Sequence, residues 1–179
     1  LDLPLVYNCG GYENPEVIRL LDGMVDIYLP DFKYGNEEDA FLFSGIRDYV
    51  PSALHSIKEM ISQVGTDLEV DGDNIATRGI IVRHLVLPGR LENTLQVLSL
   101  IREHLSPAVP VSLMSQYTPT LLVKEDPVLG RRITRQEYDE VVNRALEMGF
   151  EQLYIQQVDD RDLCPDFNDG DPFQWNKER

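Results

Sequence analysis

The feature that most constrains the fold is a regular alternation of strand-like and helix-like segments. Apolar runs of strand character occupy residues 3–8, 25–35, 79–89, 108–119 and 150–157, with helical patterns between them. Strands that alternate with helices are typical of a parallel α/β sheet with helical crossovers. A closed eight-fold barrel needs about 250 residues, and the chain has 179. We therefore expect an open sheet or a partial (β/α) barrel.

Start and stop signals locate the helices. Asn14 can cap a short helix that has Pro15 at its first position. Residues 51–65 repeat apolar residues at helical spacing and end at glycine. Thr134 and Glu137 form a capping box, which makes residues 134–149 the clearest helix of the chain.

Two segments fall outside this alternation. Residues 66–79 contain two short runs around an Asp-Gly turn, which predicts a β-hairpin inserted into the main fold. Residues 159–179 are acidic and proline-containing, and their three aromatic residues indicate an extended tail that docks on the surface. We expect a partial α/β barrel over residues 1–158 and a tail over 159–179.

Charge and cysteine content exclude several classes of protein. Sixteen basic and 31 acidic residues give a formal net charge of −15, which disfavours nucleic acid and anionic lipid as partners. The sequence lacks a long apolar run and begins without a secretory signal, so we expect a soluble, cytoplasmic protein without a membrane span. Cys9 and Cys164 are too far apart for a short metal-binding motif and are expected to be buried free thiols. The acidic runs at 36–39 and 158–162 are expected to be solvated surface.

Polar or glycine-rich sequence follows four of the apolar runs. In the second run, Asp31 and Lys33 share one face with the apolar residues before them, because side chains alternate along a strand. Buried charges are costly unless they are paired, whereas the carboxyl ends of parallel strands line ligand sites. We therefore expect Asp31 and Lys33 in a binding site, with a simple ion pair at a strand end as the alternative.

The other runs supply further candidates. Arg83 and His84 point to opposite faces, and we place Arg83 in the site and treat His84 as structural. Asn8 and Gln116 would add hydrogen-bonding groups, while Gly10 and its neighbour Gly11 would let a ligand approach the backbone. Tyr117 can be a packing residue, and His55 and His104 lie in helices without partners that suggest a site.

Four segments, "LPLVYNCGGYE", "LLDGMVDIYLPDFKYG", "TRGIIVRHLVLPG" and "MSQYTP", together resemble radical SAM proteins related to the pyruvate formate-lyase activating enzymes. The resemblance extends to about residue 156. It implies a partial (β/α) barrel in which a [4Fe-4S] cluster, held by a CxxxCxxC motif, reductively cleaves S-adenosylmethionine to a 5'-deoxyadenosyl radical. In activating enzymes that radical removes a hydrogen atom from a glycine of a partner enzyme.

The resemblance assigns site residues and partners. Asp31 and Lys33 would contact the methionine or ribose part of S-adenosylmethionine, Asn8 would meet the ribose, and Arg83 with Gln116 would complete the polar wall. Gly10 would belong to the glycine-rich turn that follows Asn8. The implied partners are a glycyl radical enzyme and an electron donor such as flavodoxin or ferredoxin. The family carries a ligand-contacting histidine where this chain has "SQYTP".

The chain departs from the family at the cluster. It contains neither a CxxxCxxC motif nor the glycine-rich motif that binds the methionine amino group. Both are expected upstream of Leu1, so the chain would be the C-terminal part of a longer enzyme, inactive alone. Without the first strands it would expose an edge and an apolar interior, which predicts self-association.

Two other functions remain open. The chain could be a barrel-derived module that never held a cluster and binds a small anionic metabolite or a protein partner. A hydrolytic enzyme with paired carboxylates has less support, because no second carboxylate is placed beside Asp31. Catalytic residues are not assigned by the sequence.

Overall fold

The computed structural model describes residues 3–158, which form an α/β fold as the alternation predicts. Its strands are β1 (Val6–Cys9), β2 (Ile27–Pro30), β3 (Glu69–Val70), β4 (Ala76–Ile80), β5 (Val82–Leu85), β6 (Val111–Met114) and β7 (Leu153–Ile155). Its helices are α1 (Pro15–Arg19), α2 (Glu37–Ser44), α3 (Tyr49–Val64), α4 (Leu91–His104) and α5 (Arg135–Glu147), with a 3-10 turn, η1 (Leu121–Val123). The tail predicted for residues 159–179 lies outside the described residues, as does Cys164.

The strands form two sheets that meet at one point. One sheet has the order β1-β2-β4-β3 and the other the order β5-β6-β7. All neighbours pair in parallel except β3, which is antiparallel to β4. Only Ile81 separates β4 from β5, and an isolated bridge joins Asp31 to Arg83. The sheets do not close into a barrel.

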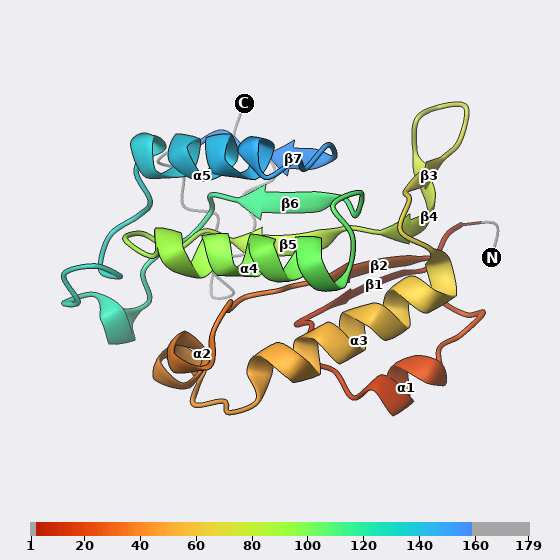
Figure 1. The fold of residues 1–179 in the computed structure, drawn as a ribbon, viewed down its shortest axis with the longest axis horizontal. Coiled ribbons are helices and arrows are strands. Elements are labelled where there is room, and N and C mark those ends of the chain that lie inside the picture. Colours follow the sequence, from red (N-terminus) through yellow and green to blue (C-terminus); the bar gives the residue numbers. More distant parts are fainter. Residues whose placement is uncertain (1–2, 159–179) are drawn as a thin grey trace, which may run out of the picture.

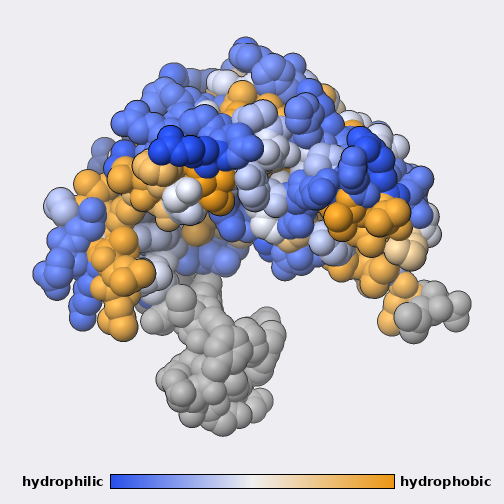
Figure 2. Space-filling view, turned by 90° about the horizontal axis from the view of Figure 1, so that it is seen from below, coloured by the Kyte–Doolittle hydropathy of each residue, from blue (hydrophilic) through white to orange (hydrophobic). Residues whose placement is uncertain are grey.

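The two faces of the strands differ. Helices α3, α4 and α5 lie in front of the strands in Figure 1, with α1 below α3, so one face is covered by helix. Tyr28, Phe32, Ile80 and Val82 belong to the buried core between strands and helices. Figure 2 shows the molecule as an arch with a hydrophilic outer side and a hollow beneath it. Along β5, Arg83 and Leu85 alternate with the buried Val82 and His84, so they face away from the helix-covered core, toward the hollow side.

Local signals in the sequence explain the helix ends. The Asn14 side chain accepts a hydrogen bond from the backbone of Glu16 and begins α1, with Pro15 as its first residue. Thr134 and Glu137 form the predicted capping box of α5. Gly65 follows α3 with a φ of 85°, a conformation that favours glycine. These predictions are confirmed.

The predictions for residues 66–79 and 79–89 were each wrong in one respect. The hairpin exists, but it is not an insertion apart from the sheet, because its second arm, β4, also pairs with β2. The run predicted as a single strand over 79–89 is divided at Ile81: Gly79 and Ile80 pair with β2, while Val82–Leu85 pair with β6. This run therefore changes its partner partway, and that change connects the two sheets.

The acidic run at 36–39 was predicted to be solvated surface, which holds for the exposed Glu37 and Glu38 but not for the buried Asp39. The Glu37 carboxylate accepts hydrogen bonds from the backbone N–H groups of Tyr49, at 2.9 Å, and Val50, at 2.8 Å, at the start of α3. Asp39 is 7% exposed and lies 3.5 Å from the Arg90 guanidinium. Both carboxylates hold neighbouring elements together.

No helix in the described part of the chain, residues 3–158, is both long and apolar enough to cross a bilayer.

Candidate functional site

A cavity opens on the hollow side of the arch, where β2, β5 and β6 end. Its volume is about 330 Å³, within the range of small-molecule sites. It is lined by Asp31, Lys33, Tyr34, Arg83, Leu85, Leu87, Met114 and Gln116. Four of the six predicted binding residues therefore line one cavity at the carboxyl ends of parallel strands.

Three charged side chains form the polar wall of this cavity. Arg83 donates from Nε to Asp31 Oδ1 at 2.9 Å and contacts the same oxygen through its Nη2 atom. Lys33 Nζ lies 3.6 Å from the other oxygen, Asp31 Oδ2. One carboxylate thus lies between two cations, which leaves a net positive charge for an anionic group of a ligand.

Burial differs among the three. The Asp31 side chain is 19% exposed and Arg83 24% exposed, whereas Lys33 is 47% exposed. The Asp31–Arg83 pair is therefore shielded from water, and Lys33 is the group best placed to meet a ligand from solution. Asp31 and Lys33 do form the ion pair given as the alternative, but Arg83 is the closer partner of Asp31.

Gln116 completes the polar part of the wall. Its Oε1 accepts a hydrogen bond from Gln156 Nε2 at 3.4 Å. Gln156 is in turn fixed by the Tyr138 hydroxyl, which accepts its backbone N–H at 2.8 Å and donates to the Leu113 carbonyl at 2.6 Å. Helix α5 thereby orients a cavity residue at the end of β6.

The opposite wall is apolar. Leu85 and Leu87 follow Arg83 on the same face of the strand, as alternation requires, and Met114 precedes Gln116 by two residues. The alternation along the strands that selected Arg83 and Gln116 also predicts Leu85, Leu87 and Met114 as residues of the cavity. Tyr34 could not be predicted in this way, because strict alternation would place it on the face opposite Lys33, whereas both residues line the cavity beyond the end of β2 at Pro30.

The remaining two predicted residues lie beside the cavity. A Cβ atom built on Gly10 would be 3.9 Å from Lys33 Nζ, so this glycine faces the lysine. Asn8 is exposed on β1 and is the register partner of Leu29. Neither lines the cavity in the described structure.

Gly11 has a structural reason for being glycine. Its φ is +78°, and a Cβ atom there would lie 1.9 Å from the Asp31 carbonyl oxygen. The turn after β1 therefore packs directly against the backbone that carries Asp31. Glycine at this position is required for close approach of backbone to backbone, while ligand contact stays a prediction.

His84 is a structural residue, as the sequence indicated. It is fully buried, with Nδ1 2.7 Å from the Phe32 carbonyl and Nε2 2.9 Å from Thr94 Oγ1. A carbonyl can only accept, so Nδ1 carries the hydrogen of the neutral ring and Nε2 accepts from threonine. Burial lowers the pKa of His84 to about 4, which keeps the ring neutral near pH 7.

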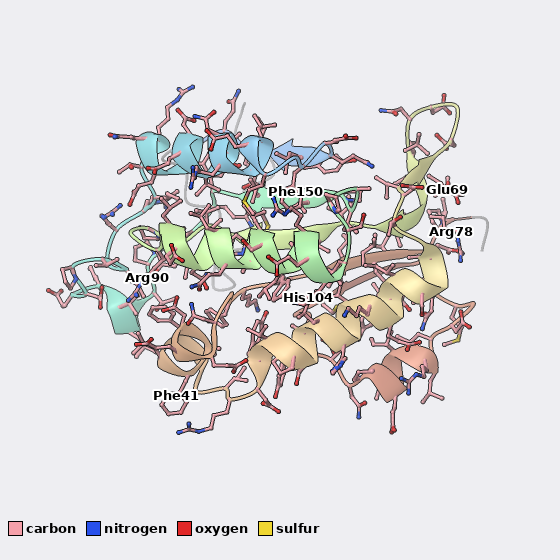
Figure 3. The ribbon with its side chains drawn as sticks, viewed as in Figure 1. Phe41, Glu69, Arg78, Arg90, His104 and Phe150 are labelled. Atoms are coloured by element: carbon pink, nitrogen blue, oxygen red, sulfur yellow. The ribbon has the colours of Figure 1, made fainter. Side chains whose placement is uncertain are left out.

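The other residues considered from the sequence lie elsewhere. The Tyr117 hydroxyl donates to the Leu129 carbonyl at 2.8 Å, so it fixes a loop. Figure 3 shows His104 at the opposite end of α4 from Arg90, which precedes that helix. His55 borders a hollow of about 680 Å³ between α1 and α3, on the helical side of the molecule.

The residues of this chain do not fit an iron–sulfur cluster. Within residues 3–158 no group of three or more His, Cys, Asp or Glu side chains could hold a metal ion. Cys9 is a free, half-buried thiol, and burial raises its pKa to about 11, which opposes the thiolate form that binds metals. The whole sequence has two cysteines, fewer than the three of the family motif.

An uncharacterized protein of Methanocaldococcus jannaschii is 31% identical over 156 residues, which is 86% of this chain and 41% of that protein. The chain thus spans about two fifths of the length of this relative. No family model matches the chain.

Proposed function

We propose that the chain is the S-adenosylmethionine-binding part of a radical SAM enzyme related to the pyruvate formate-lyase activating enzymes. The observation that carries this proposal is the cluster of Asp31, Lys33 and Arg83 at the carboxyl ends of parallel strands, in a cavity on the hollow side of the sheet. The open sheet would then be part of a (β/α) barrel in a longer, cytoplasmic protein.

The cavity has chemistry suited to this ligand. S-adenosylmethionine carries a carboxylate and an ammonium group at one end, and Lys33 and Asp31 offer a charge opposite to each. Gln116 can exchange hydrogen bonds with hydroxyl or amide groups. Leu85, Leu87 and Met114 provide the apolar surface that an uncharged part of the ligand needs.

The residues of this chain would bind and orient the ligand rather than perform redox chemistry. S-adenosylmethionine, once reductively cleaved, supplies the radical that abstracts hydrogen in this class of enzyme. The cluster that reduces it would have to be held by residues outside this chain, because the cysteines present do not fit it. A glycyl radical enzyme as substrate, and flavodoxin or ferredoxin as electron donor, are part of the same proposal.

A second function is favoured by one observation, the excess of positive charge in the cavity. Two cations surround one carboxylate, an arrangement that also suits a small anionic metabolite in a module without a cluster. This alternative requires no residues beyond those described.

One comparison separates the two functions. Iron, sulfide and the visible spectrum are measured for this chain and for the complete encoded protein after anaerobic reconstitution. The proposal predicts a cluster in the complete protein, none in this chain, and release of 5'-deoxyadenosine from S-adenosylmethionine on reduction. Absence of iron and sulfide from both proteins would contradict it and favour the metabolite-binding module.

Self-association of the separate chain also stays a prediction. Leu5 and Val6 near the free edge of β1 are about half exposed, and Leu121 and Leu122 of η1 are nearly fully exposed. Figure 2 shows hydrophobic surface at both feet of the arch. Sedimentation velocity tests the prediction, and a monomer at all concentrations would contradict it.

A further inference from the structure

The segment that carries Asp31 and Lys33 is not part of a regular strand. Strand β2 ends at Pro30, and only two backbone bonds continue its pairing. Asp31 N–H donates to the Cys9 carbonyl at 3.0 Å, and Phe32 N–H donates to the Arg83 carbonyl at 2.8 Å. Beyond Phe32, other groups must satisfy the backbone of residues 32–35.

Three side chains supply those partners. His84 Nδ1 bonds the Phe32 carbonyl at 2.7 Å, and the Tyr49 hydroxyl accepts the Lys33 N–H at 2.7 Å. Asn93 makes two bonds: its Nδ2 donates to the Lys33 carbonyl at 3.0 Å, and its Oδ1 accepts the Gly35 N–H at 2.8 Å. The two backbone groups of Lys33 are thus both held by side chains from helices.

These side chains are buried. Tyr49 is 1% exposed, His84 0% and Asn93 2%. The buried polar or charged residues among residues 3–158 are five, and three of them, His84, Asn93 and Thr94, belong to this arrangement. Burial of a polar group costs free energy that its hydrogen bonds only offset, so the net effect of these side chains is to fix the backbone of the segment more than to add stability.

The contact between this segment and α4 is direct. A Cβ atom on Gly35 would lie 2.4 Å from Gln96 Cβ, 2.6 Å from the Val97 nitrogen and 2.7 Å from the Asn93 carbonyl oxygen. Any side chain at position 35 would therefore push the segment away from the helix. Glycine allows Asn93 to reach across to both Lys33 and Gly35.

We propose that Tyr49, His84 and Asn93 are positioning residues of the cavity, which hold the backbone of residues 32–35 so that the Asp31 and Lys33 side chains keep a fixed geometry toward a ligand. The identity of the ligand, S-adenosylmethionine, rests on the proposed function. The role of the three side chains in holding the backbone does not depend on it. Fixed charged groups bind better because less freedom is lost on binding.

The test compares Asn93→Leu with Ile101→Val, both on α4. The first replaces a buried amide by an apolar side chain of similar size, and the second trims a core residue that makes no bond to residues 32–35. Both variants are expected to lower stability. Tyr49→Phe is the second test variant, since it removes one hydroxyl and keeps the ring in place.

Two quantities are measured on the wild-type chain and each variant: the Kd for S-adenosylmethionine by equilibrium dialysis, and backbone NMR order parameters of residues 32–34. We expect Asn93→Leu and Tyr49→Phe to weaken binding by about tenfold and to lower these order parameters. Ile101→Val should leave both unchanged at a comparable melting temperature. Equal affinities in all variants would overturn the positioning role.

The two measurements distinguish an error in the positioning role from an error in the proposed function. If the wild-type chain and the complete encoded protein both fail to bind S-adenosylmethionine, the proposed function is wrong. The order parameters then decide the inference alone: a loss of order in Asn93→Leu but not in Ile101→Val supports it, and unchanged order in both overturns it.

Discussion

Arg83 and Asp31 form an ion pair across the junction of the two sheets, with Arg83 Nε 2.9 Å from Asp31 Oδ1 and a backbone bridge between the same residues. The pair joins β5 to the end of β2 through both main chain and side chain. Because both side chains are largely buried, it is part of the frame of the cavity as well as of its polar wall.

Replacing Arg83 by leucine should therefore destabilise the fold. The change leaves the Asp31 carboxylate partly buried with only the more distant Lys33, and we expect a loss of about 1–3 kcal/mol in the free energy of unfolding. Urea unfolding measures this loss. In the double variant with Asp31→Asn the loss should be smaller than the sum of the two single effects, and strict additivity would show that the pair contributes nothing.

Gly10 and Gly11 offer a matched pair of substitutions. Gly11→Ala places a Cβ atom against the Asp31 carbonyl in a conformation with positive φ, so it should destabilise the chain by more than about 1 kcal/mol and displace Asp31. Gly10→Ala has no atom nearer than 3.9 Å and should fold normally. Thermal unfolding distinguishes them, and equal melting temperatures would contradict the close approach described for Gly11.

Burial of His84 predicts a dependence of stability on pH. Its pKa is lowered from 6.5 to about 4 in the folded state, so the unfolded chain takes up a proton first as pH falls. The stability associated with the neutral, buried His84 is fully present above pH 6.5. It is lost as the pH falls from 6.5 to about 4, and the free energy of unfolding then decreases by at most about 1.4 kcal/mol per pH unit.

The free energy of unfolding, measured by urea at several pH values, tests this dependence. His84→Gln lacks the titrating ring. Between pH 6.5 and 4.5 its free energy of unfolding should therefore change less steeply with pH than that of the wild type, by up to about 1.4 kcal/mol per pH unit. The carboxylates contribute equally to both proteins over this range. The same slope in both proteins would show that His84 is protonated in the folded state.

The sequence predicted the order of strands and helices because each element carries its own local signals. The Asn14 cap, the Thr134–Glu137 capping box and the stop at Gly65 act within a few residues and are present in the structure. Alternation along strands likewise placed Arg83 and Lys33 at the cavity and His84 in the core.

Other features depend on contacts between distant segments and could not be predicted. Residues 79–82 read Gly-Ile-Ile-Val, and nothing in them marks Ile81 as the point where the strand partner changes from β2 to β6. Glu37 is an exposed residue, and nothing in the sequence indicates that its carboxylate accepts the Tyr49 N–H at the start of α3. Tyr49 and Asn93 contact the Lys33 backbone from helices and lie 16 and 60 residues away in sequence, distances over which periodicity carries no information.

We propose that the cavity formed by Asp31, Lys33, Arg83 and Gln116 binds S-adenosylmethionine, and calorimetric titration of the ligand into the complete encoded protein tests this most directly. Lys33→Met is the decisive variant because Lys33 is half exposed and its removal should hardly affect stability. Lys58→Met, on the helical side, is the matched control. We expect the wild type and the control to bind the ligand, and Lys33→Met to bind it about tenfold or more weakly. Equal affinity in all three proteins, or no binding by the wild type, would contradict the proposed site.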